Sequence, residues 1–268
     1  MADIFDIPDK DPSEITLSYY RDSEDNRESG LNYYQISDNQ MQFSAGYTQL
    51  NSEGFTDEIK SDKKFLMIGT NPYEDLSSTL RFEHWKADNA LRIETTELKI
   101  TIATDSSQIS ISPQSRSIEL YLREAIQRDN ITLSSQGLFL QYQYFTENDL
   151  SFSLSHQNHK YSKDIGAAAT NPFLLFILQP ATLSLASGFE KKSFAINISK
   201  LLAKGNLSFM YKVSTSALDN AKLKSYSIDW QRPVNTDMAL NFSIGQSSSV
   251  ESSTTSEFYN ISITYYFY

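Results

Sequence analysis

The sequence contains no cysteine, which excludes disulfides, thiolate catalysis and cysteine-ligated zinc. It also has no long hydrophobic run. The longest, residues 173–178, has six residues, far fewer than the roughly 20 that a membrane-spanning helix needs. We find no glycine-rich phosphate loop or nucleotide fingerprint and no metal-ligand pattern, so we predict neither a cofactor nor a bound metal. The net charge of −10 argues against binding of nucleic acid through its phosphates.

The amino terminus lacks the basic start and the apolar stretch of an export signal. Because the remainder reads poorly as a cytosolic fold, we interpret the chain as a mature exported protein without its signal. Residues 1–13 carry four aspartates and predict an acidic, disordered leader. We see no internal repeat and no linker after it, so residues 14–268 are expected to form one domain.

The chain is rich in tyrosine and phenylalanine, with 16 of each, and small polar residues separate them. The carboxyl-terminal segment alternates strictly between the two kinds. One face carries Tyr259, Ile261, Ile263, Tyr265 and Phe267, and the other carries Asn260, Ser262, Thr264, Tyr266 and Tyr268. A period of two predicts a β-strand with one apolar and one polar face. The polar face carries few charges, unlike the outer face of a soluble sandwich, which favours a lipid-facing band around a hydrated interior.

The same alternation recurs along the chain and predicts further strands. They centre on residues 15–21, 31–37, 41–49, 63–71, 79–86, 90–104, 109–122, 131–145, 150–160, 170–177, 182–186, 194–198, 207–213, 226–230 and 238–245. Short polar connections such as 105–107 and 234–237 alternate with longer ones such as 51–62 and 163–171. This pattern is typical of barrels with short periplasmic turns and longer extracellular loops. We therefore predict an all-β, closed antiparallel transmembrane β-barrel of about 16 strands, with 14 or 12 as alternatives.

Three of the predicted strands change phase, so that apolar residues move from one face to the other. In residues 90–104, for example, Leu91 and Ile93 are odd, whereas Leu98 and Ile100 are even. The segments around Pro113 and Gly137 change in the same way. We interpret these changes as β-bulges, or as strand ends that project beyond the bilayer.

The carboxyl terminus resembles that of Gram-negative outer-membrane barrel proteins, in which an amphipathic last strand ending in an aromatic residue is read by the barrel-assembly machinery. Ile261, Ile263, Tyr265, Phe267 and Tyr268 carry the likeness. Here Phe267 is in phase with the apolar face and Tyr268 lies one residue beyond, a departure from the usual pattern. A wider likeness to porins covers residues 14–268. It implies an outer-membrane location with surrounding lipid and the assembly machinery as partners, and it is compatible with an oligomer.

Charged residues concentrate in one part of the predicted barrel wall and are our candidates for a selectivity site. They are Arg81, Glu83, Arg92, Glu94, Glu97, Lys99, Arg116 and Glu119. Opposite charges on adjacent strands would create a transverse field across a pore, which discriminates solutes by charge and dipole. The alternative is that they pair to stabilise the wall, or that they lie above the membrane.

The three histidines and the aromatic residues suggest weaker alternatives. Ser155 with His156, or His156 with His159, would suit a hydrolase or metal site, but these spacings place the side chains on opposite faces of a strand. Inward-facing rings would instead suit a saccharide path, although such rings more often mark the membrane interface. The candidate rings are Tyr20, Phe139, Phe145, Tyr266 and Tyr268.

Taken together, the patterns favour a passive, porin-like channel for small hydrophilic solutes or ions, without enzymatic activity. An outer-membrane enzyme or an export or assembly barrel is the first alternative. A soluble all-β carbohydrate-binding domain is the second. Dependence on detergent distinguishes the second alternative from the others.

Overall fold

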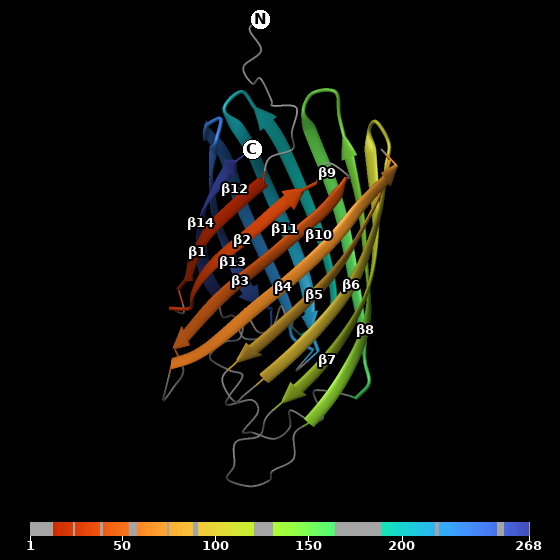
Figure 1. Ribbon diagram of the computed structural model, residues 1–268. Coiled ribbons are helices and arrows are strands. Elements are labelled where there is room, and N and C mark those ends of the chain that lie inside the picture. The colour runs from red at the N-terminus through yellow and green to blue at the C-terminus, as the bar shows by residue number, and fades with distance from the viewer. Residues whose placement is uncertain are drawn as a thin grey trace, which may run out of the picture.

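The computed structural model describes residues 13–23, 25–37, 40–53, 58–73, 75–87, 91–120, 131–163, 189–217, 220–250 and 255–267. These residues form fourteen β-strands (Figure 1). The strands are β1 (Ser13–Asp22), β2 (Arg27–Ile36), β3 (Met41–Glu53), β4 (Glu58–Tyr73), β5 (Leu76–Ala87), β6 (Leu91–Ala103), β7 (Ser107–Leu120), β8 (Ile131–Phe145), β9 (Leu150–Tyr161), β10 (Glu190–Leu202), β11 (Gly205–Ser216), β12 (Lys222–Asn235), β13 (Met238–Ser249) and β14 (Thr255–Phe267). Among the described residues no helix is long and apolar enough to cross a membrane.

Each strand pairs with the strands before and after it in the chain, and β1 pairs with β14 to close the barrel. The closing seam is antiparallel and runs without a register shift from Ser13 opposite Phe267 to Asp22 opposite Phe258. Closure satisfies the backbone hydrogen-bonding groups of both terminal strands, so the sheet has no free edge. The fold is therefore the closed antiparallel barrel that the alternation predicts.

The wall contains fourteen strands, which is the first of the two alternatives to the predicted count of about 16. β9 pairs directly with β10, from Asn158 opposite Lys192 to Leu150 opposite Lys200. The strands predicted at 170–177 and 182–186 lie outside the described residues. The predicted leader, apart from Ser13, lies outside them as well. The other fourteen predicted strands all correspond to strands of the wall.

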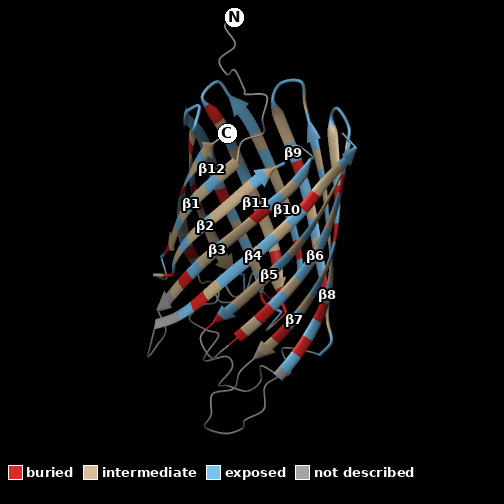
Figure 2. Ribbon diagram, in the orientation of Figure 1, coloured by how far each residue is buried: buried red, intermediate tan, exposed pale blue. Residues whose placement is uncertain are grey.

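The apolar side of the strands faces outward. On β14, for example, Ile261 and Ile263 are 40% and 45% exposed, whereas Ser262 between them is 8% exposed. The same alternation of burial runs along neighbouring strands around the barrel (Figure 2). Exposed apolar side chains in a continuous band are what a lipid-facing surface requires, and they are the reverse of a soluble sandwich, whose apolar faces pack together.

The phase changes in β6, β7 and β8 are not β-bulges. The pairing of β7 with β8 runs in one register from Ser107 opposite Tyr144 to Leu120 opposite Ile131. Register shifts occur elsewhere, in β4, β10 and β12. The strands instead continue past the apolar band, where their outward residues become polar and their inward residues become apolar. This geometry fits the second interpretation, because these strand ends extend past the apolar band.

The two rims of the barrel differ in the length of their connections. β1 starts and β14 ends at the rim where the connections between strands have two to four residues. At the opposite rim the connections have three to five residues, except those between β7 and β8 (121–130) and between β9 and β10 (162–189), which are longer. We call these the short-turn rim and the long-loop rim. The lumen between them is the candidate site.

Candidate transport lumen

Small polar side chains line most of the inner wall. They belong to the residues that alternate with the exposed apolar ones, and serine and threonine predominate among them, with asparagine and glutamine between. The buried serines and threonines are Ser44, Ser61, Thr101, Ser110, Ser112, Ser135, Ser153, Ser193, Ser214, Ser216, Ser227, Ser243, Ser256 and Ser262. Several bond to each other across strands, as Thr101 does with Ser110 at 2.9 Å. Such a wall leaves space and offers hydrogen-bonding groups to water.

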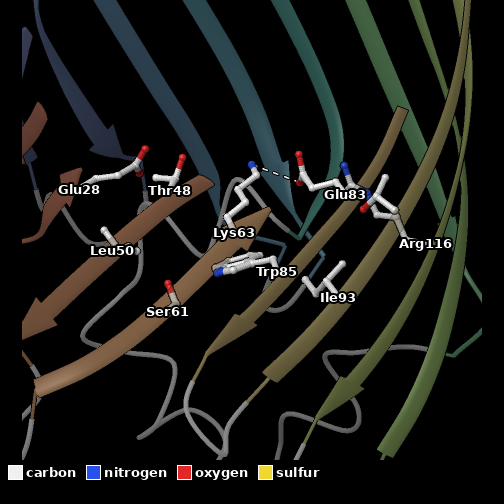
Figure 3. A pocket seen from close by; sticks show the side chains of 10 residues that line it. Glu28, Thr48, Leu50, Ser61, Lys63, Glu83, Trp85, Ile93 and Arg116 are labelled. Carbon is white, nitrogen blue, oxygen red and sulfur yellow. Dashed lines mark ion pairs between the residues drawn. The ribbon is translucent and has the colours of Figure 1, made fainter. Parts of the chain in front are cut away.

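One section of the wall, on β4 and β5, holds a compact cluster of charges (Figure 3). The Glu83 carboxylate lies 3.2 Å from the Lys63 Nζ and 2.9 Å from an Arg81 guanidinium nitrogen. Glu83 therefore forms ion pairs with two cations at once. Glu83 is only 20% exposed, whereas Lys63 is 46% and Arg81 is 34% exposed, so the positive groups are the more accessible members of the cluster.

The ring of Phe65 supports the cluster. The Arg81 guanidinium lies 4.2 Å from the centre of the Phe65 ring, within the range of a cation–π contact. The ring in turn lies against Gly46, its register partner on β3. A Cβ at position 46 would collide with this ring. The glycine thus lets Phe65 lie flat along the wall, and the flat ring gives Arg81 a surface to stack on.

Further charges continue onto β6 and β7. Glu97 lies opposite Arg81 in the register, and Arg116 lies opposite Thr95. A hollow of about 170 Å³ lies along this wall and is lined by residues that include Glu28, Lys63, Glu83 and Arg116 (Figure 3). Charged groups from β2, β4, β5 and β7 thus meet around one inward-facing space.

The inward charges are distributed unevenly around the barrel. On β4 to β7 the strand alternation turns four cations inward, with two carboxylates among them. These residues are Lys63, Arg81, Glu83, Glu97, Lys99 and Arg116. On β12 to β14 and β1 to β3, the inward charged residues that the structure describes are all acidic. They are Glu14, Asp22, Glu28 and Asp229. The lumen therefore has a cation-rich wall and an acidic wall.

The eight predicted selectivity residues divide between the two faces. Arg81, Glu83, Glu97, Lys99 and Arg116 belong to the inward set. Arg92, Glu94 and Glu119 alternate with inward residues and face outward, so they do not line the pore. Arg92 and Glu94 pair with each other at 2.6 Å on the outer surface, where they are 43% and 53% exposed. They face outward because β6 and β7 pass the phase change without a bulge.

The sequence interpretation missed Lys63, Phe65 and Glu28. Lys63 is followed by Lys64, and the pair gives no indication of which lysine faces the lumen. The apolar residues Leu66 and Ile68 on the same strand do provide a signal, because they face lipid and so assign the odd positions to the lumen. Glu28 precedes the strand predicted at 31–37, whereas β2 already begins at Arg27.

The histidines lie as their spacing predicts. His156 faces outward and is exposed, whereas His159 faces inward and is 2% exposed. The ring of His159 lies between Ser135 Oγ, at 3.5 Å from Nδ1, and the Gln157 side-chain amide, at 2.7 Å from Nε2. An amide cannot stabilise an imidazolium as a carboxylate does, so this contact lacks the acid of a nucleophilic triad. His84 faces outward, 3.6 Å from Glu94.

Among the predicted aromatic residues, Tyr20, Phe139 and Tyr266 have inward positions on β1, β8 and β14. The Tyr20 ring lies 5.8 Å from that of Phe258, also inward. Phe145 ends β8 at the short-turn rim and is 40% exposed. Tyr268 lies outside the described residues. The inward rings belong to different parts of the wall, and the structure does not bring the predicted set together into a continuous path.

Comparisons with known proteins support the fold. No family model matches the chain, and no curated protein sequence matches it. Several solved structures do. The porin NanC has 10% sequence identity and a TM-score of 0.52, and the match covers 94% of this chain and 98% of NanC. A loop-deletion variant of OmpT, an outer-membrane protein of Vibrio cholerae, has 9% identity and a TM-score of 0.52 over 95% and 98%. The porin KdgM, in complex with disordered oligogalacturonate, has 7% identity and a TM-score of 0.48 over 95% and 99%. The likeness to NanC and to the OmpT variant shows a barrel fold similar to that of porins.

Proposed function

We propose that this protein is an outer-membrane channel through which small hydrophilic solutes diffuse passively. The observation that carries the proposal is the closed barrel with an apolar outside and a mostly polar inside. Fourteen strands spaced about 4.8 Å apart and tilted by roughly 40° give a backbone diameter of about 28 Å. Eight-stranded barrels are filled by side chains, whereas a barrel of this width with mostly small inward residues has room for water.

The charged walls suggest how such a channel would select solutes. Water confined between a cation-rich wall and an acidic wall experiences a transverse field, which orients dipolar solutes and attracts ions of both signs to opposite sides. We propose that Lys63, Arg81 and Glu83, with Glu97, Lys99 and Arg116 beside them, form the selective part of the wall. Charged or zwitterionic solutes of low mass fit this lumen better than apolar ones.

A planar bilayer experiment tests the channel. Purified protein added to a bilayer in potassium chloride is expected to produce stepwise current increments, with a conductance that rises in proportion to the bulk conductivity of the salt. Liposomes that contain the protein are expected to swell in small sugars or amino acids and not in large polymers. Protein that inserts into the planar bilayer and into the liposomes, as shown by protease protection, but gives neither current nor swelling would disprove a passive channel.

A further inference from the structure

The outer surface carries a group of lysines beside the apolar band at the long-loop rim. On β10 and β12 the outward position next to the last apolar residue is a lysine: Lys192 follows Phe194 toward the rim, and Lys224 follows Tyr226. Lys222 lies one outward position further on β12. Side chains at this height lie where lipid headgroups meet the hydrocarbon layer.

The register aligns these lysines with other hydrogen-bond donors. Asn158 pairs with Lys192, Lys192 pairs with Thr215, and Thr215 pairs with Lys222. An amide, an ammonium, a hydroxyl and a second ammonium therefore stand side by side on four neighbouring strands. With strands about 4.8 Å apart, the backbones at Lys192 and Lys222 are roughly 10 Å apart. That spacing lets two ammonium groups converge on one phosphate.

More cationic groups surround this row at the rim. A hollow next to it is lined by residues that include Asn158, Lys160, Lys163 and Lys191, and all three of these lysines are exposed. Lys191 donates a hydrogen bond to the Asn220 amide oxygen at 3.1 Å, a neutral partner, and it forms no ion pair with a carboxylate of the residues that the structure describes. The row and the hollow share Asn158, and we call the lysines of both together the lysine patch.

The lysine patch is unusual in its lack of acidic neighbours. On β9 to β12, no outward residue that the structure describes is acidic, and Glu190 is turned inward, where it pairs with Lys212 at 2.5 Å. Two outward arginines elsewhere at the long-loop rim have carboxylates close by: Arg21 pairs with Asp25 at 2.5 Å and Arg92 with Glu94 at 2.6 Å. The chain as a whole carries a net charge of −10, so a patch of lysines with no acidic outward neighbour among the described residues of β9 to β12 is not a general property of its surface.

We propose that the lysine patch binds the headgroup phosphates of a membrane lipid in the leaflet around the long-loop rim. The inference rests on the proposed placement of the apolar band in a membrane, but not on channel activity. Lys192, Lys222 and Lys224 contact the phosphates, and Thr215 and Asn158 donate further hydrogen bonds to phosphate oxygens. The acyl chains of the same lipid lie directly beneath, on Phe194 and Tyr226 of the apolar band, which we also call the belt. A lipid with two phosphates fits the width of the patch best.

Native mass spectrometry of the full chain in neutral detergent tests the proposal, with diphosphorylated lipid A as the probe and the same lipid without its phosphates as the comparison. The wild-type protein is expected to retain diphosphorylated lipid A and to lose the phosphate-free form. The triple substitution K192Q/K222Q/K224Q should weaken retention by roughly tenfold to a hundredfold, since each basic residue near an anionic headgroup contributes modestly. K192R/K222R/K224R should restore it, because arginine keeps the charge.

A matched control removes three other outward lysines, K64Q/K86Q/K200Q, and is expected to retain the lipid as the wild type does. Inorganic phosphate in millimolar excess should not displace the lipid, because it lacks the acyl chains that rest on the belt. Equal retention by the wild type and the glutamine triple, or equal binding of the phosphate-free lipid, overturns the proposal, and so does displacement by inorganic phosphate alone. Channel currents are recorded separately on the same samples, so that a failure of lipid binding and a failure of conduction are distinguishable.

Discussion

At the scale of single residues, Glu83 has the most consequential position in the lumen. It neutralises part of the charge of both Lys63 and Arg81 while being less exposed than either. Replacement by glutamine preserves the shape and removes one negative charge, so the two cations would lose their ion-pair partner and the lumen wall would become more positive. We expect Glu83→Gln to shift the reversal potential toward anions in a potassium chloride gradient, with a small change in conductance.

The matched control is Glu94→Gln, on the neighbouring strand β6. Glu94 pairs with Arg92 but lies on the outer face, so its loss should leave the reversal potential unchanged. An equal shift in both variants would mean that the effect comes from net charge rather than from position in the lumen. No shift in Glu83→Gln would remove this cluster from the proposed selective wall.

Residue-level predictions from the sequence depended on knowing which face each side chain occupies. Where the alternation is clean, as in β14, the faces follow directly from residue type, and the structure agrees. Arg92 and Glu94 were placed in the lumen although they face outward, because their strand reverses polarity partway along. The stack of Arg81 on Phe65 depends on a glycine on the adjacent strand, and no local pattern reveals such a cross-strand contact.

At the scale of whole strands, the polarity reversal in β6 to β8 creates a small apolar core inside the barrel near the long-loop rim. Leu91, Ile93, Ile118 and Leu133 face inward and are at most 4% exposed. The sequence alone cannot distinguish this arrangement from a bulge, since both move apolar residues from odd to even positions. Only the continuous register decides between them.

This inner core makes a prediction about stability. Ile118 is fully buried, so Ile118→Ala should lower the free energy of unfolding by about 2–5 kcal/mol, since it loses both burial and packing. On the same strand Ile111 is 46% exposed on the belt, where lipid refills the space that a smaller residue leaves. Ile111→Ala should therefore cost less, about 1–2 kcal/mol. Urea unfolding in lipid vesicles measures both, and equal losses would contradict an inner core.

At the scale of the whole molecule, the two rims of the closed barrel differ in the length of their connections. Antiparallel pairing of β1 with β14 places the start of β1 and the end of β14 together at the short-turn rim. The longer connections lie at the opposite rim. Outer-membrane barrels place short turns in the periplasm and longer loops outside the cell. The lysine patch and the inner apolar core both lie toward the long-loop rim, so a correct orientation matters for the lipid proposal as well as for the channel.

The absence of cysteine makes this orientation directly testable by single-cysteine labelling. Val250 lies at the long-loop rim and is 52% exposed, and Asp105 lies in the exposed turn between β6 and β7 at the short-turn rim. In intact cells a membrane-impermeant maleimide should label Val250→Cys and not Asp105→Cys. Permeabilising the outer membrane should make both reactive, which confirms that each thiol is accessible. Labelling of Asp105→Cys alone in intact cells would mean that the barrel has the opposite orientation, and the lysine patch would then face the inner leaflet.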